Sequence, residues 1–339
     1  MKREDNEKKA RRRSEWGLTT YEVKRRIGAL NPFASKKQQT MKSIKRKERM
    51  FIWSMLAIPI AAFLVFWVYV NTDAILLAFR NIDHAAGGKE YWTLQNFVKI
   101  KDMFVKGGAG QNMVKYGINT LMFWALGVVW GIPHSILLTY AFHKKLIGMK
   151  VYRVLLFLPS IICAVALAGI FQAFISENGA IGKILLDVFH IDRVPSWFQE
   201  EEYAVAALLF YNFFFGFAGQ YILYSGAMAN VSTEITEAAY MDGVTMWQEL
   251  IYIDIPLMWP TISMTIITSF GGLFGASGPI LLFTAGMEST WTFGYWIFDQ
   301  VRVYQSYYMP AALGLCFTLI GYPLALLVRR LIENLFSTE

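Results

Sequence analysis

Long uncharged stretches alternate with shorter polar ones along this chain. Six of the uncharged stretches reach the roughly 20 residues that a helix needs to cross the apolar core of a bilayer. They are Met50–Val70, Tyr116–Phe142, Val154–Phe174, Tyr203–Val231, Pro256–Gly286 and Tyr307–Val328. None of them contains Asp, Glu, Lys or Arg, and one charge at the centre of a span costs about 2.5–3.5 kcal/mol. The pattern predicts an all-α, polytopic membrane protein with six transmembrane helices.

The distribution of charge predicts how these helices are oriented. Residues 1–49 carry 17 Lys and Arg against 6 Asp and Glu, although the 339-residue chain as a whole is only 17% charged. Six spans place both termini on one side, and that side then holds 23 of the 32 basic residues. The positive-inside rule makes it the cytoplasmic side. We therefore expect a multi-pass protein of the cell membrane (plasma or inner) with both termini in the cytoplasm.

The basic N-terminal segment has two interpretations. Residues 1–49 form either a solvated cytoplasmic tail or an arm that contacts anionic lipid, where each basic residue contributes about 1 kcal/mol. No nucleic-acid recognition motif accompanies the basic residues, so nucleic acid is not an expected partner. We expect residues 50–79 to contain the first transmembrane helix.

The loop between the fourth and fifth spans is acidic and contains two predicted short helices. Ser232 is placed to cap the first helix, and Gly243 to end it in the left-handed conformation that glycine tolerates. Thr245 and Gln248 have the spacing of a capping box at the start of the second helix. A connector needs no such structure. The loop is therefore either an amphipathic elbow on the membrane surface or a protruding dock for a soluble partner.

The end of the second helix is predicted from a proline. Met246, Leu250 and Ile253 recur at helical spacing along one side. We expect Pro256 to force its neighbour Ile255 out of helical geometry and so to end this helix.

The spacing of residues in this loop resembles a known signature. Glu237-Ala238-Ala239 is followed by Gly243 and, after nine further residues, by Ile253-x-Ile255-Pro256. This pattern is similar to the EAA loop of binding-protein-dependent ABC importers, with Ile255 where leucine is usual. The resemblance implies that the EAA loop (residues 232–256) seats in a cleft of a cytoplasmic ATPase, and that residues 80–336 form the permease domain. The coupling residues that it implies are Glu237, Ala238, Ala239, Asp242, Gly243 and Pro256.

A second run points to the kind of importer. Residues 152–159 read YRVLLFLP, which is similar to the YRxLLxLP segment of sugar-importing permeases. Together the two motifs resemble the maltose and multiple-sugar type. The resemblance implies a permease subunit of a carbohydrate importer. Its partners would be a second homologous permease, two ATPase subunits and an external solute-binding protein.

The chain shows no site of its own for ATP, metal or catalysis. It lacks a G-x-x-x-x-G-K-[ST] phosphate-binding loop, so any ATP would be bound by the partner ATPase subunits. The four histidines have no metal-like spacing, and both cysteines lie inside predicted spans. No serine–histidine–acid set can be drawn with its members on one side of the membrane. We therefore expect neither an enzyme nor a cofactor.

Candidate residues for a solute path lie in the fourth and fifth spans. Asn212, Phe215 and Gly216 share one helix face, where an amide lies beside aromatic rings that can stack on sugars. Periodicity alone equally favours a packing face. The resemblance implies that Asn212, Gly216 and Ser269 match sugar-pocket positions of maltose-type permeases. Glycines crowd the second half of the fifth span and predict either a tight crossing or a broken helix.

Two alternatives to a sugar importer remain open at this stage. One is the same machine with a peptide, an amino acid or phosphate as cargo. The other is a different class of protein, a passive channel or a multispan lipid-modifying enzyme. The absence of acidic residues from all six spans disfavours the enzyme.

Overall fold

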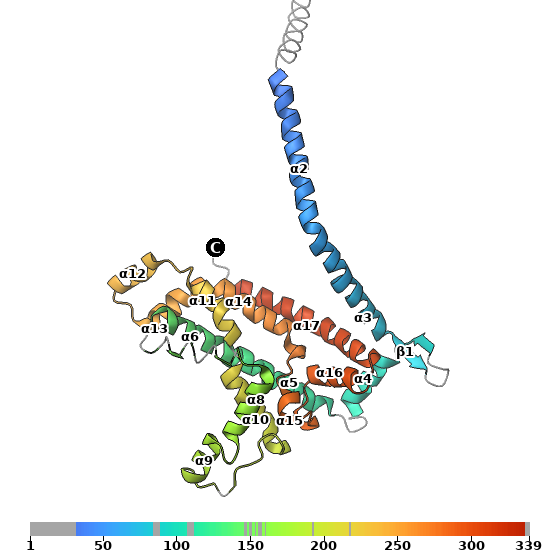
Figure 1. Cartoon of the computed structure of the whole chain (residues 1–339), viewed down its shortest axis with the longest axis vertical. Helices are drawn as coiled ribbons and strands as arrows, with labels where there is room; N and C mark the ends of the chain where they lie inside the picture. Colours follow the sequence, from blue (N-terminus) through green and yellow to red (C-terminus); the bar gives the residue numbers. More distant parts are fainter. Residues whose placement is uncertain are drawn as a thin grey trace, which may run out of the picture. The chain divides into compact units, whose positions relative to one another are not determined.

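The structure is a computed structural model that describes residues 32–83, 89–106, 112–145, 148, 151–152, 154, 158–159, 161–191, 193–216 and 218–335. It consists of two compact units, Met1–Asp73 and Ala74–Glu339. Figure 1 shows helices throughout both units. Six segments are long and apolar enough to cross a membrane, as the sequence predicts.

The first unit is a single helical rod in its described part. It comprises α2 (Pro32–Ala62), the π-helical η1 (Phe63–Tyr69) and the start of α3 (Val70–Ala78). The first candidate span runs over Lys45–Ala78, and none of its most apolar window is buried. Residues 1–31 of the predicted cytoplasmic tail lie outside the described residues, whereas its last part belongs to α2.

The second unit contains the other five candidate spans. Several are built from consecutive helical segments that change geometry within the span. The second span consists of α5 (Met113–Ala125), η3 (Leu126–Gly131) and α6 (Ile132–His143), and the third of α8 (Ala164–Ile175) and α9 (Ala180–Asp187). The fourth consists of α10 (Glu201–Phe215) and α11 (Ala218–Met228), and the fifth begins with α13 (Met246–Glu249), η4 (Leu250–Asp254) and α14 (Ile255–Gly271). The sixth is the single helix α17 (Tyr308–Leu335).

The segment after the first span is more ordered than the sequence indicates. The strands β1 (Arg80–Asp83) and β2 (Lys89–Trp92) form an antiparallel hairpin, and α4 (Gln95–Lys106) follows it. Buried Asn96 at the start of α4 donates from its side-chain amide to the carbonyls of Ala78 and Arg80. This long-range anchor fixes a hairpin whose strands are too short to be recognised in an otherwise helical sequence.

Two spans differ from the stretches predicted for them. The third begins at Ala164, after an extended Cys163, and half of the run from 152 to 159 lies outside the described residues. The fifth is a broken helix, as its glycines suggest. After α14 the chain makes the 3-10 turn η5 (Leu273–Gly275), extends, and resumes as α15 (Ile280–Thr284). The turn η6 (Glu288–Thr290) and α16 (Phe293–Arg302) then lead to α17.

Two apolar clusters hold the second unit together. The larger one joins α8, α10, α15, α16 and α17 around the rings of Phe171, Tyr211 and Phe283. The smaller one joins α6, α11 and α14 around Tyr224 and Met258. The EAA loop, with its helices α12 (Thr233–Met241) and α13, lies at the end of the unit where α6 and α11 meet (Figure 1).

Candidate functional site

The first helix of the EAA loop has both ends fixed by its own sequence. The Ser232 hydroxyl accepts a hydrogen bond from the Glu234 N–H (3.2 Å) at the start of α12. Gly243 follows the helix with φ +77°. The N–H groups of Gly243 and Val244 return to carbonyls of the last turn at 3.1 and 3.0 Å, which is a Schellman motif. Both predicted caps of this helix are confirmed.

The second helix begins as predicted but does not end as predicted. The Thr245 N–H donates to Gln248 Oε1 at 2.9 Å, within a complete capping box. The chain then passes through η4 into α14 without a break, and Ile255 has helical angles (φ −59°, ψ −48°). The prediction that Pro256 ends the helix is therefore wrong.

The π-helical geometry of η4 explains why the proline is tolerated. The Ile255 N–H bonds the carbonyl of Leu250, five residues back. Pro256 then lies in the first turn of α14, and the wider turn before it leaves room for the proline ring, which in a regular α-helix would meet the carbonyl four residues back. The loop is consequently joined to the fifth span by continuous helix.

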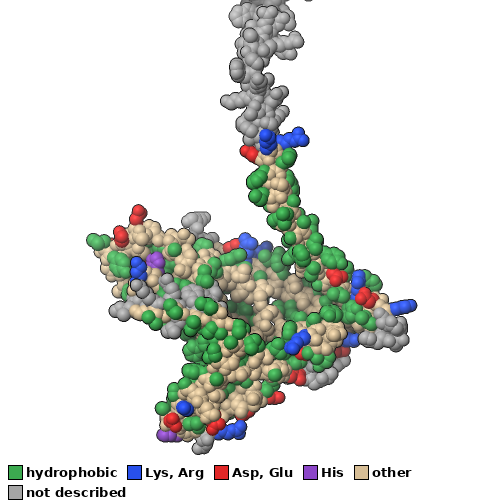
Figure 2. Space-filling model, in the orientation of Figure 1, with side chains coloured by type: hydrophobic (Ala, Val, Ile, Leu, Met, Phe, Trp, Pro, Cys, Tyr) green, Lys and Arg blue, Asp and Glu red, His purple; other side chains and the backbone are tan. Residues whose placement is uncertain are grey.

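The tip of the loop presents acids together with large apolar side chains. Met241 is 88% and Trp247 66% exposed. The predicted coupling residues Glu237, Ala238, Asp242, Gly243 and Pro256 are exposed as well, whereas Ala239 is buried in the elbow. Figure 2 shows acidic side chains gathered at this end of the second unit. Such a surface is chemically suited to a cleft with cationic and apolar walls.

A polar cluster links the loop to the end of the second span. Lys144, which follows α6, forms an ion pair with Glu249 of α13 and donates to the Tyr240 hydroxyl of α12 at 3.2 Å. Burial alone would lower the pKa of the Lys144 ammonium, but its hydrogen bonds to Glu249 and Tyr240 outweigh burial and raise that pKa. This cluster is not evident from the sequence. Its local signal in the sequence is an acid, Glu249, at the end of α13 and next to the apolar Leu250.

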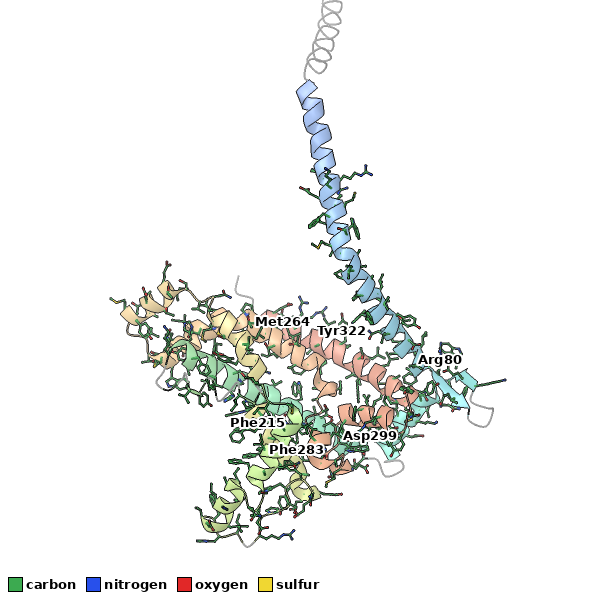
Figure 3. All side chains as sticks on the ribbon, in the orientation of Figure 1. Arg80, Phe215, Met264, Phe283, Asp299 and Tyr322 are labelled. Carbon is green, nitrogen blue, oxygen red and sulfur yellow. The ribbon has the colours of Figure 1, made fainter. Side chains whose placement is uncertain are left out.

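Three of the four predicted solute-path residues lie together on α10. The Asn212 side-chain amide donates to the Leu208 carbonyl at 2.9 Å. Phe215 packs against the ring of Tyr211 (centroids 5.1 Å apart), which also contacts Phe283 (4.7 Å), so that Phe215 and Phe283 lie near one another (Figure 3). Gly216 ends α10. In this conformation Asn212 is turned to its own helix.

The fourth predicted residue, Ser269, lies against a different element. Its hydroxyl donates to the Ile266 carbonyl within α14, and its carbonyl accepts from Trp124 of α5 at 3.0 Å. Among the described residues we find no hydrogen bond between Ser269 and Asn212. The structure therefore brings the α10 residues together and holds Ser269 at the α5–α14 contact.

A cavity of about 580 Å³ lies where the fifth span breaks, between the end of α14, α16 and α17. Its floor includes the stacked rings of Phe274 and Phe317 (centroids 4.3 Å apart). Small residues form most of the remaining wall, namely Gly271, Gly275, Gly294, Gly314, Gly321 and Ala325. The α17 side of this wall was not among the predicted residues, although the spacing of Gly314, Thr318, Gly321 and Ala325 places them on one helix face.

Relatives of this chain are permeases of sugar transport systems. The lactose transport system permease protein LacF of Rhizobium radiobacter is 27% identical over 186 residues, which are 53% of this chain and 62% of that protein. The maltose/maltodextrin transport system permease protein MalF of Vibrio vulnificus is 31% identical over 144 residues, 42% of this chain and 27% of that protein. This chain therefore spans less than two thirds of either relative.

Two further similar proteins, one of them a solved structure, are matched over nearly their whole length. The multiple sugar-binding transport system permease protein MsmF of Streptococcus mutans is 25% identical over 277 residues, which are 79% of this chain and 91% of that protein. A crystal structure of a bacterial ABC transporter involved in alginate import contains a chain with a TM-score of 0.66 and 21% identity. That match covers 87% of this chain and 99% of the other. The structural likeness establishes the fold.

Residues 131–336 match the family model described as binding-protein-dependent transport system inner membrane component. The match covers more than half of the chain and includes the whole EAA loop. It confirms the resemblance drawn from the two motifs and agrees with the expectation of a transport component rather than an enzyme. The chain belongs to the family of binding-protein-dependent transport system inner membrane components.

Proposed function

We propose that this protein is the transmembrane permease subunit of an ATP-driven importer for carbohydrates, a sugar or an oligosaccharide. The observation that carries the proposal is the EAA loop. Its tip exposes acids beside Met241 and Trp247, its two helices are capped on both sides of Gly243, and α13 continues as helix into the fifth span. This is the arrangement that a lever driven by a soluble partner requires.

The coupling mechanism follows from that continuity. Two cytoplasmic ATPase subunits would bind ATP and close, and the tip around Glu237 and Asp242 would move with the cleft that holds it. Because α13, η4 and α14 are consecutive helical segments, displacement of α13 turns or shifts α14. The proposed complex switches between inward- and outward-facing states in this way. A second homologous permease would complete the path.

A carbohydrate is the proposed cargo on two grounds. The relatives are named for lactose, maltose and multiple sugars. A second solved structure of similar fold is that of a bacterial alginate ABC transporter in complex with an alginate pentasaccharide-bound periplasmic protein. In this chain Asn212, Phe215, Gly216 and Ser269 are the proposed contacts, through amide, ring and hydroxyl. Bringing Ser269 to the α10 residues would be part of the conformational change.

The proposed orientation follows the distribution of charge. The basic tail (residues 1–49), both termini and the EAA loop lie in the cytoplasm, and the permease domain extends over residues 80–336. An external solute-binding protein would then deliver its ligand to the opposite face, which contains the hairpin β1–β2.

The test is ATP-driven uptake in vesicles that contain the purified complex. Glu237→Lys and Gly243→Pro should each lower uptake by about tenfold or more, equivalent to at least ~1.4 kcal/mol of coupling, with unchanged membrane insertion. Glu177→Lys, at an exposed acid outside the loop, is the matched control. Wild-type uptake in both loop variants would remove the lever role.

Competition with labelled sugars identifies the cargo class, and uptake that persists without ATP would indicate a channel.

A further inference from the structure

Lys144 at the end of the second span is held between the two helices of the EAA loop. Its ammonium pairs with Glu249 Oε1 of α13 and donates to the hydroxyl of Tyr240 of α12, whose ring centroid lies 4.9 Å away. The side chain of Lys144, directly after α6, therefore contacts the loop on both sides of Gly243. This contact fixes the angle between α12 and α13 from outside the loop.

Tyr140, one turn earlier on α6, completes the joint. Its hydroxyl lies 2.9 Å from the Met246 carbonyl and 3.2 Å from Glu249 Oε2, and its ring lies 5.5 Å from the Lys144 ammonium. Both oxygens of the Glu249 carboxylate are therefore engaged by the last turn of α6. Residues four apart on a helix share a face, so Tyr140 and Lys144 form one contact surface.

Burial makes this joint stiff. The side chains of Lys144 and Glu249 are only 11% and 3% exposed, and the nearby carboxylate of Asp254, which also interacts with Lys144, is buried as well. Removal of one member of a buried pair leaves an uncompensated charge, which is strongly unfavourable. Separation of the loop from α6 would break the hydrogen bonds of Lys144 and Tyr140 with the loop together, so the two are expected to move together.

We propose that Lys144 is a positioning residue that delivers movement of the EAA loop to the second span, in parallel with the helix that delivers it to the fifth. The inference rests on the proposed importer function. Its consequence reaches the solute path, because α6 packs along α11 in the fourth span, directly after the helix that carries Asn212. The loop would thus drive the second and fourth spans through the ion pair and the fifth span through the backbone.

The test compares transport with hydrolysis in the complete complex reconstituted with its ATPases. Lys144→Met should lower the amount of sugar imported per ATP hydrolysed by about fivefold or more, the lower range of measured allosteric couplings, while ATP hydrolysis and co-purification of the ATPases persist. Lys144→Arg, which keeps the charge and the donors, should restore most of that ratio. The matched control is Lys145→Asn, an adjacent exposed lysine at φ +53°, where asparagine is tolerated.

A distance measurement tests the joint independently of transport. Spin labels at His143→Cys and Met241→Cys, both exposed positions, are introduced after replacing Cys163 and Cys316 by serine. The distance distribution should be narrow in the otherwise native protein and broad with Lys144→Met. If Lys144→Met does not fold, the double variant Lys144→Met/Glu249→Gln, which removes the pair's charges, replaces it and should give the same broad distribution.

The outcomes separate this inference from the proposed function. An unchanged import ratio together with an unchanged distribution overturns the role of Lys144. A parallel fall in uptake, hydrolysis and co-purification overturns it too, because that pattern indicates a merely structural residue. Absence of ATP-driven uptake in the native complex would instead contradict the importer, and the distance measurement would still report on the joint.

Discussion

At the scale of single residues, Gly243 shows how backbone geometry alone can require a residue type. Its φ is +77°, and a Cβ placed on it would meet nothing within 4 Å. The requirement is therefore conformational rather than steric. We expect Gly243→Ala to destabilise the end of α12 by about 1–2 kcal/mol, because L-residues pay that much in the left-handed region. Gly243→Asn should lose less.

Hydrogen exchange of the Val244 amide measures this effect directly, since that amide bonds the carbonyl of Ala239 at 3.0 Å. Faster exchange in the alanine variant than in the asparagine variant is the expected order. Equal protection in both variants would show that tolerance of a positive φ is not the reason why position 243 is a glycine.

Asp299 in α16 gives a pH dependence with a definite sign. Burial raises the pKa of this carboxyl above its usual value near 3.8, and Arg302 offsets part of the increase. The folded protein therefore holds the proton more firmly than the unfolded chain, so stability falls as pH rises through the window just above 3.8. We predict that Asp299→Asn raises the melting temperature in detergent at neutral pH and that its advantage disappears in more acidic buffer.

The exposed carboxylate of Asp187 provides the comparison. Asp187→Asn should leave the melting temperature nearly unchanged at both pH values. A stabilisation by Asp299→Asn that is the same at every pH would indicate an effect other than the ionisation of this group.

Sequence determines the local contacts of the EAA loop but not its distant ones. The caps at Ser232 and Gly243 and the box at Thr245 join residues within five positions of each other, so the residue types suffice to predict them. The pair of Lys144 and Glu249 joins residues 105 positions apart. Nothing in either neighbourhood selects that partner. It becomes visible only once α6 and α13 are placed side by side.

At the scale of elements, the π-helical stretch η4 is the least expected feature of the loop. The rule that proline disfavours a helical residue before it failed at Ile255, because a hydrogen bond to the fifth residue back replaced the α-helical pattern. A π-bulge amounts to one extra residue in a helix, and such bulges occur frequently at functional sites. The wider turn lets the helix of the loop continue through Pro256 into α14.

Deletion of one residue from η4 tests that role. Removing Tyr252, whose side chain is 75% exposed, should remove the wide turn, so that the ring of Pro256 clashes with the carbonyl four residues back and kinks or breaks the helix between α13 and α14. Helix content by circular dichroism should be preserved while ATP-driven uptake is lost. Tyr252→Ala, which keeps the π-helical turn, should transport normally. Transport by the deletion variant would contradict the importance of that turn.

Gly278, in the break of the fifth span, is required both by its backbone conformation and by a close neighbour. Gly278 has φ +57°, and an added Cβ would lie 2.9 Å from the Phe123 ring of α5. We expect Gly278→Ala to destabilise the protein by about 1–2 kcal/mol from backbone strain alone, and further by displacing the ring. The melting temperature should therefore fall, and the loss should be smaller in a Phe123→Leu background.

Gly127→Ala is the control for this experiment, because nothing lies within 4 Å of a Cβ at that position. It should change the melting temperature little. A fall of the same size for Gly127→Ala would show that any glycine replacement has this effect and that the contact with Phe123 is not the cause.

At the scale of the whole molecule, composition predicts the spans but not how they are assembled. A helix in lipid satisfies its own backbone, so uncharged runs of sufficient length identify the six crossings. The break after Gly271 was foreseeable from the glycine cluster. The anchoring of the hairpin β1–β2 by Asn96 and the hydrogen bond from Trp124 to Ser269 depend on contacts between separate segments, and the sequence contains no local signal for them.

The orientation of the assembled molecule yields the last prediction. The proposed lever requires the EAA loop to face the cytosol, where an ATPase can reach it. In a chain with Cys163 and Cys316 replaced by serine, Met241→Cys should react with a membrane-impermeant maleimide in inside-out vesicles only, since Met241 is 88% exposed. Val188→Cys, 65% exposed in the segment between the third and fourth spans, should react in right-side-out vesicles only. One span, the fourth, separates the two positions, so opposite labelling of the two fixes the sidedness of the second unit. Labelling of Met241→Cys from the outside alone would place the loop beyond the reach of ATP and remove both the lever and the role of Lys144.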